Sequence, residues 1–294
     1  MALDQQHEIE RMQRGKDEMS FFEHIAELRT HILRSFLAIG VVGAVAFVNK
    51  DFIFNTLIFG PRHPDFITYR ALCSFSHAAG LGEGMCFTPP AFELITRQLG
   101  EVLMQHLYVS FWLGMIGAFP YIFWEFWRFI SPGLYEKERK AVRGVVFVCS
   151  LLFLAGVAFG YFVIAPFSIS FLAGYTLEGL QVAPTLDSYV TYMTMFTLPM
   201  GLVFEMPILG YFLAKIGLIG PAFLRQFRRH AVVVILIIAA IITPPDVVSQ
   251  TMVGIPLYIL YEVSILVVAN IYRKRQRAME LGAAPSKEVS KKEE

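Results

Sequence analysis

Three carboxylates occupy unusual positions in this apolar chain: Glu27, Glu138 and Glu205. Glu205 is the one charged residue of the stretch GLVFEMPILGYFL, residues 201–213. A carboxylate without a local cation can take a guanidinium group in a bidentate pair, and an acid inside a membrane can carry a proton. These three residues are therefore the first candidates for chemistry.

Sequence neighbours distinguish Glu27 and Glu138 from other acids close to them. Glu27 lies in the amphipathic segment SFFEHIAELRTHILRSF, and its neighbour at i+4 is His31, a residue type that is mostly neutral at pH 7. Glu138 has no cation at i±3 or i±4, whereas Glu136 faces Lys140 at i+4. Both acids are therefore predicted to be available to a ligand, the alternative being a solvated helix face.

Glu205 presents a different problem, because a charged side chain at mid-membrane costs about 3 kcal/mol on insertion scales. Its neighbours at i±3 and i±4 are apolar, so no local ion pair is expected. Pro199 and Pro207 bracket it and predict a bent backbone that admits water. We interpret Glu205 as lining a hydrated concave face, the alternative being a protonated acid bonded to a freed carbonyl.

The elements that hold these acids are predicted to be membrane helices. The chain is 55% hydrophobic and 17% charged, against about 45–50% and about 25% in soluble domains. A crossing needs about 20 apolar residues. We expect an all-α polytopic protein with six transmembrane helices, at 33–48, 102–124, 144–164, 190–213, 231–242 and 252–271.

The last two helices are expected to be short and separated by the prolines of TPPD, residues 243–246. The fifth holds about 12 apolar residues, which span only about 18 Å. All Lys and Arg residues lie on one side of the predicted membrane except Lys50, Arg62, Arg70 and Arg97. The positive-inside rule therefore places the N- and C-termini in the cytoplasm.

Three regions follow from this arrangement. Residues 1–20 form a cytoplasmic tail, residues 21–272 the membrane domain and residues 273–294 a charged cytoplasmic tail. The membrane domain includes a long outer loop at 50–101. A cleavable signal peptide is the alternative for the first apolar run, but the many carboxylates before that run disfavour it.

Four segments, in this order and spacing, resemble the landmarks of the TatC family: EHIAELRTHI, FISPGLYEKER, FEMP and TPPDVVSQ. The resemblance covers about residues 21–272. It implies the six-helix core subunit of a twin-arginine translocase in the bacterial inner membrane. Such a subunit binds signal peptides with paired arginines and exports folded proteins by the proton-motive force. The implied partners are the single-span subunits TatA and TatB, membrane lipid and further copies in a larger complex.

The resemblance also assigns residues. It implies that Glu27 and Glu138 bind the signal peptide together with neighbours in the same motifs, namely Arg29, Phe129, Pro132, Leu134 and Tyr135. It implies docking of TatA and TatB at Thr243, Asp246 and Gln250, the alternative being that these groups cap the turn. No enzyme activity, cofactor, metal or nucleic acid is expected.

Cysteines in the outer loop offer one further prediction. Cys73 and Cys86 lie on the side that faces an oxidising compartment, so a disulfide between them is expected, with two unpaired thiols as the alternative. Cys149 lies in the third apolar run and is expected to pack in the core.

A competing function is a proton-coupled small-molecule transporter in which Glu205 and Glu262 carry protons. Many transporters show paired repeats with broken helices at matching positions, and no such symmetry is visible here. A membrane hydrolase is a weaker alternative, because no candidate nucleophile and base stand together. No phosphate-binding loop for ATP is present.

Overall fold

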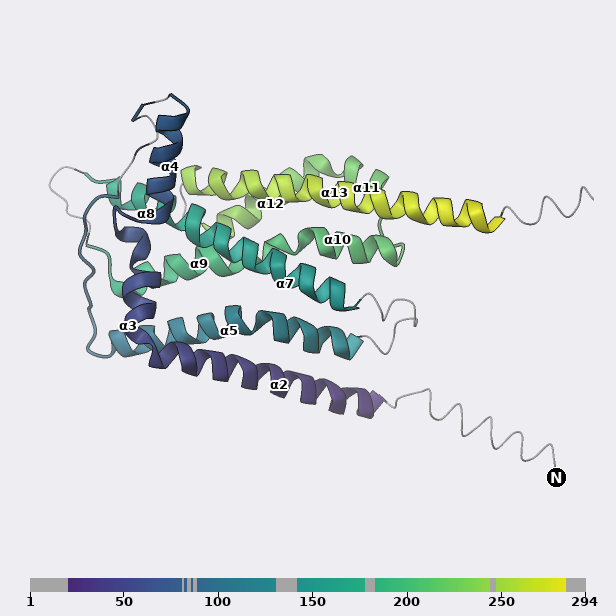
Figure 1. The fold of residues 1–294 in the computed structure, drawn as a ribbon, viewed down its shortest axis with the longest axis horizontal. Coiled ribbons are helices and arrows are strands. Elements are labelled where there is room, and N and C mark those ends of the chain that lie inside the picture. Colours follow the sequence, from purple (N-terminus) through teal and green to yellow (C-terminus); the bar gives the residue numbers. More distant parts are fainter. Residues whose placement is uncertain are drawn as a thin grey trace, which may run out of the picture. The chain divides into compact units, whose positions relative to one another are not determined.

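A computed structural model describes residues 21–80, 82–83, 86, 89–130, 142–177, 183–243 and 247–283. Within those residues the regular structure is helical, apart from an isolated parallel bridge between Ile95 and Thr185. Figure 1 shows the helices in chain order. They are α2 (Phe21–Val48), α3 (Lys50–Phe52), α4 (Ile67–Ala78), α5 (Glu101–Ile130), α7 (Val142–Phe159), α8 (Ala165–Gly174), α9 (Leu186–Phe204), α10 (Met206–Lys215), α11 (Pro221–Gln226), α12 (Arg228–Ile242) and α13 (Val247–Ala283).

Five stretches of the described chain are long and apolar enough to cross a membrane. They are Ile25–Val48, Glu101–Phe129, Gly144–Gly174, Leu186–Lys215 and Ser249–Lys274. The fifth helix of the predicted six corresponds to α12, which has only 15 residues, as its short apolar run indicates. The polytopic all-α fold is confirmed.

The expectation of a short sixth helix is wrong. Helix α13 has 37 residues and continues to Ala283, beyond the predicted boundary at residue 272. Pro256 lies inside it without ending it. After the apolar part the sequence continues with Arg, Lys, Gln, Met, Glu and Ala, which are good helix formers, so the helix is not obliged to stop where the apolar run stops.

The described chain forms two compact units. The first comprises the described residues within 21–48 and 110–150, and in it α2 and the second part of α5 lie side by side (Figure 1). Their backbones approach closely at Gly114, where an added Cβ would lie 2.6 Å from the carbonyl oxygen of Ile39. A small residue at a helix crossing permits this approach in a membrane.

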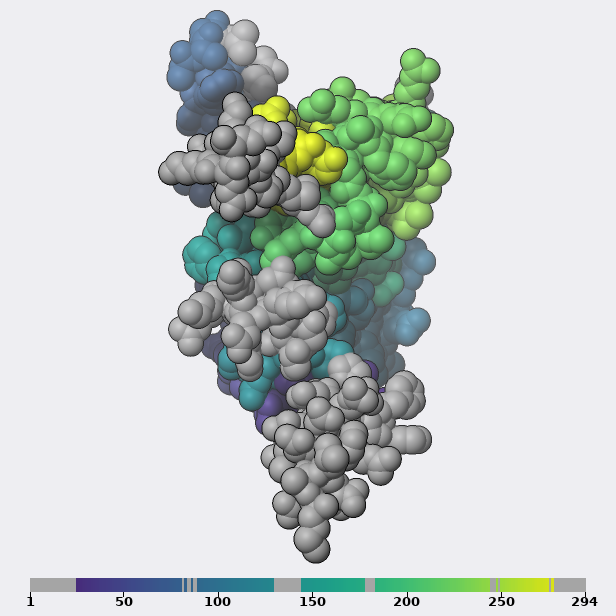
Figure 2. All heavy atoms as spheres, turned by 90° about the vertical axis from the view of Figure 1, so that its right-hand side faces the viewer, coloured from purple at the N-terminus to yellow at the C-terminus, as the bar shows by residue number. Residues whose placement is uncertain are grey.

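The second unit comprises the described residues within 49–109 and 151–283. Its helices α10, α11 and α12 all pack against α13, and Figure 2 shows the green atoms of this region beside the yellow atoms of α13. The best buried side chains include Phe153, Phe196, Met200, Leu257 and Ile265. The π-helical turn η4 (Gly160–Ile164) joins α7 to α8, and Gly160 lies against the backbone of α9.

The first part of segment 50–101, up to Ala78, is largely helical. After α3 it continues through a π-helical turn η1 (Ile53–Ile58), a 3-10 turn η2 (Gly60–Arg62) and α4. The Tyr69 hydroxyl of α4 lies 2.8 Å from the Pro61 carbonyl oxygen and 3.0 Å from Ser170 Oγ. Burial raises the pKa of Tyr69 above its ordinary value, so this phenol remains a neutral donor that fastens α4 to α8.

Candidate functional site

Glu27 lies on α2 close to the first described residues. Its side chain is 37% exposed, yet its Oε2 atom is buried and has no hydrogen-bond partner among the described residues. A buried carboxylate oxygen that lacks a donor is costly and is satisfied by any cation or N–H group that reaches it. Among the described residues, no donor thus reaches this oxygen of Glu27.

The other oxygen of Glu27 has a neighbour. His31 Nε2 lies 3.9 Å from Glu27 Oε1, at the i+4 spacing read from the sequence. His31 Nδ1 forms a hydrogen bond with Glu125 Oε2 of α5, and Tyr121 donates to Glu125 Oε1 at 2.9 Å. His31 is 6% and Glu125 1% exposed. The prediction that Glu27 has only a histidine nearby therefore overlooked Glu125, a buried acid that is hydrogen-bonded to the same imidazole ring.

Phe129 is the second predicted site residue that the structure brings to this place. Its ring meets the His31 ring edge to face, with centroids 6.0 Å apart. Arg29 is exposed on α2. The remaining predicted signal-binding residues, Pro132, Leu134, Tyr135 and Glu138, lie outside the described residues.

Glu205 lies where two helices meet in the second unit. It ends α9 and begins α10, and its carbonyl oxygen accepts from the backbone N–H groups of Ile208 and Leu209. The helix is therefore interrupted between Pro199 and Pro207, as those prolines predict. The Glu205 side chain is half-buried.

The two described residues of the expected docking site make bonds within the chain. Thr243 is buried and donates to the Ala239 carbonyl oxygen at 2.9 Å, so it closes the last turn of α12. Gln250 Nε2 donates to the Leu236 carbonyl oxygen at 3.1 Å. Asp246 lies outside the described residues. Thr243 thus closes the end of α12, whereas Gln250 joins α13 to α12, and docking stays a prediction.

Cys73 and Cys86 form a disulfide in the structure, and Cys149 is buried in α7. His77 Nε2 lies 3.8 Å from Cys86 Sγ, which makes Cys73, His77 and Cys86 the single group with metal-ligand spacing within the described chain. Metals bind thiolates, and the disulfide uses both sulfur atoms. The cluster therefore fits a disulfide cross-link within segment 50–101 better than a metal site.

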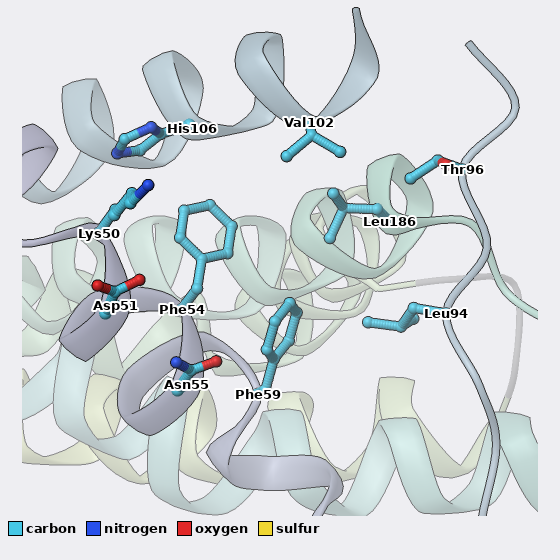
Figure 3. Close-up of a pocket in the computed structure, with 10 residues that line it drawn as sticks. All are labelled: Lys50, Asp51, Phe54, Asn55, Phe59, Leu94, Thr96, Val102, His106 and Leu186. Atoms are coloured by element: carbon cyan, nitrogen blue, oxygen red, sulfur yellow. The ribbon is translucent and has the colours of Figure 1, made fainter. Parts of the chain in front are cut away.

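A cavity of about 380 Å³ opens within the second unit. Figure 3 shows Lys50 and Asp51 at one end, Leu94 and Thr96 at the other and two phenylalanines between them. Its walls are mostly apolar, and its two charged residues have opposite signs. The cavity lacks the pair of acids that two guanidinium groups need.

Glu262, the second acid of the transporter hypothesis, is paired within the chain. Arg228 Nη2 donates to Glu262 Oε2 at 2.7 Å, and the Tyr258 hydroxyl donates to its other oxygen at 3.2 Å. This arrangement joins α12 to α13. An ion pair and a phenol hydrogen bond explain Glu262 without a proton path.

Comparison with known proteins supplies an independent finding. The family model for Sec-independent protein translocase protein TatC matches residues 23–256. TatC of Blattabacterium sp. subsp. Periplaneta americana is 40% identical over 271 residues, which cover 90% of this chain and 100% of the relative. TatCy of Bacillus subtilis is 35% identical over 263 residues, which cover 89% of this chain and 93% of the relative.

Two solved structures are also similar. Both are crystal structures of the twin-arginine translocase receptor TatC. One has a TM-score of 0.62 at 32% identity and covers 84% of this chain and 98% of that chain. The other, determined in DDM, has a TM-score of 0.65 at 33% identity and covers 83% of this chain and 99% of that chain.

Proposed function

Since this chain belongs to the TatC family of Sec-independent protein translocases, we propose that it binds the paired arginines of a signal peptide through Glu27 and Glu138. The chain is a multi-span protein of the bacterial inner membrane and a receptor component of the twin-arginine translocase. The observation that carries the proposal is the buried Oε2 atom of Glu27, which has no hydrogen-bond partner among the described residues. The transporter hypothesis is not supported.

The chemistry of the ligand favours two acids. A guanidinium group binds one carboxylate through two parallel N–H bonds, so adjacent arginines require two carboxylates or one with additional acceptors. Each charge-assisted hydrogen bond is worth about 1.5–3 kcal/mol. Glu27 supplies the first acid, and Glu138 follows α5 in the same segment that carries Phe129. Arg29, Pro132, Leu134 and Tyr135 complete the proposed contact surface.

The wider role follows from the family. We propose that the chain assembles with TatA and TatB and with further copies of itself, and that the complex exports folded cargo at the expense of the proton-motive force. It would do so as a non-enzymatic receptor without a cofactor. Thr243, Asp246 and Gln250 are the proposed docking residues, and the exposed part of Gln250 offers its amide oxygen to a partner helix.

A binding measurement tests the signal-peptide site. The full chain in detergent is titrated with a fluorescent peptide that carries two arginines and with the same peptide carrying two lysines. We expect tighter binding of the arginine peptide and a loss of about 10- to 150-fold for Glu27→Gln or Glu138→Gln, from one charge-assisted hydrogen bond. Thr30→Ala is the matched control, because Thr30 is exposed and its hydroxyl donates to the Ala26 carbonyl oxygen of its own helix.

Equal affinity for the two peptides would contradict the proposal. So would a Glu27→Gln variant that binds the arginine peptide as the unaltered chain does. For the docking residues, cysteines at Gln250 and along a partner's span should crosslink, and failure across a complete scan of partner positions would count against that surface.

A further inference from the structure

His31 lies between two carboxylates in the first unit. Its Nδ1 atom is hydrogen-bonded to Glu125 Oε2, and its Nε2 atom lies 3.9 Å from Glu27 Oε1. Both His31 and Glu125 are buried, whereas Glu27 is the exposed member of the three. The residue proposed to receive a signal arginine is thus already faced by a side chain that can become a cation.

We propose that protonated His31, held in place by Glu125, competes with the signal-peptide arginine for Glu27. This inference rests on the proposed function of Glu27. It makes His31 a residue that sets the affinity of the site and Glu125 a positioning residue that acts through His31.

The geometry favours this role because an imidazolium has an N–H donor on each of its two nitrogens. With Nδ1–H directed to Glu125, the second proton of the charged form faces Glu27. In the neutral form with Nδ1 protonated, Nε2 instead presents a lone pair to the Glu27 carboxylate. Only the protonated ring therefore compensates the charge of Glu27 and opposes the entry of a guanidinium.

Glu125 is held in this position by hydrogen bonds to both of its carboxylate oxygens. Its Oε1 atom accepts from the Tyr121 hydroxyl, so both carboxylate oxygens have donors. Arg34 on α2 interacts electrostatically with Glu125, and Arg34 and Arg128 interact with Tyr121. Among the described side chains, Glu27 on the same helix and Glu125 on α5 thus face His31 directly, while Tyr121 and Arg34 interact with Glu125, and Arg128 interacts with Tyr121.

A guanidinium can displace this competitor because it offers bidentate bonds, whereas Nε2 of His31 lies beyond hydrogen-bond distance from Glu27. Binding of the arginine should therefore strengthen as His31 loses its proton. Histidine is the side chain that ordinarily changes charge between pH 5 and 8, so this is the range in which the effect is tested.

The test uses the full chain in detergent and the two-arginine peptide, titrated at intervals from about pH 6 to about pH 8. We expect the affinity of the unaltered chain to rise by about two- to five-fold over this range, the size typical of a partly exposed ion pair. His31→Gln should bind about two- to five-fold more tightly at the low end and show a flat pH profile. Thr30→Ala should reproduce the unaltered profile.

Glu125→Gln tests whether Glu125 acts through His31. As a single substitution, Glu125→Gln should tighten peptide binding near pH 7. Combined with His31→Gln, it should leave the affinity of the His31→Gln variant unchanged. Tyr121→Phe provides a second, smaller change to the same carboxylate if Glu125→Gln does not remain monodisperse. A purely structural role of these residues would instead weaken binding in every background.

Failure of the His31 proposal can be distinguished from failure of the proposed function of Glu27. If the unaltered chain binds the two-arginine peptide in a Glu27-dependent way but with a flat pH profile, the His31 proposal is overturned and the function stands. If binding does not depend on Glu27 at all, the proposed function fails and the His31 proposal fails with it. A His31→Gln variant that binds less tightly than the unaltered chain at about pH 6 also overturns the proposal.

Discussion

Glu205 illustrates how a single residue can be tolerated at membrane depth. The backbone break between α9 and α10 places this acid where the helical hydrogen-bond pattern changes, and its side chain is only half-buried. A charged residue facing lipid costs about 3 kcal/mol, and contact with water or a polar partner removes much of that cost. We therefore predict that Glu205 meets water or a partner helix.

Substitution of Glu205 separates charge from hydrogen bonding. Glu205→Gln removes the charge but keeps the size and the hydrogen bonding, whereas Glu205→Leu removes both the charge and the hydrogen bonding, so we expect a greater loss of cargo export for Leu than for Gln. Export of a twin-arginine cargo in cells is the measurement. A cysteine at position 205 should also react with a water-soluble maleimide. Normal export by both variants and an unreactive cysteine would make Glu205 a structural residue only.

A second prediction about individual residues concerns the Cys73–Cys86 disulfide. It closes a loop with a sequence separation of 13, which is worth about 3 kcal/mol in the chain-entropy model. We expect intact-mass analysis of protein purified without reductant to show one alkylated cysteine, Cys149, when the chain is unfolded before alkylation, and three after reduction. Three modified cysteines before reduction would rule the bridge out.

At the scale of helices, the sequence predicted the boundaries that proline chemistry controls. The interruption at Glu205 and the separation of α12 from α13 both follow from the positions of prolines. The length of α13 did not follow, because helix formers continue past the apolar run. The contact of His31 with Glu125 was also missed, because those residues are 94 positions apart and only packing of α2 on α5 brings them together.

The crossing of α2 and α5 can be tested at Gly114. Replacement by Val places atoms against the Ile39 carbonyl, and overpacking of this kind costs about 1–3 kcal/mol. We expect Gly114→Val to lower the midpoint of thermal unfolding in detergent. Gly40→Ala is the matched control, because a Cβ there meets no atom within 4 Å and alanine favours the helix. Equal midpoints for both variants would contradict the close approach.

For the whole molecule, the question that matters most is how many times the chain crosses the membrane. Five described stretches qualify by length and apolarity, and α12 is the sixth element that the sequence predicts to cross. Its 15 residues reach about 22 Å, against about 30 Å of hydrocarbon. Arg225 and Arg229, exposed beside its first turn, are suited to an interface. A short crossing with basic residues at one end fits a locally thinned bilayer.

The number of crossings can be read from the two termini. An even number places both ends on one side of the membrane, and an odd number places them on opposite sides. We expect Ala2→Cys and Ser290→Cys, each in a Cys149→Ala background, to resist an impermeant maleimide in intact spheroplasts and to react after permeabilisation. This result would place both termini in the cytoplasm, as the distribution of basic residues predicts. Labelling of one terminus alone in intact spheroplasts would mean that α12 does not cross, and the chain would then have five spans.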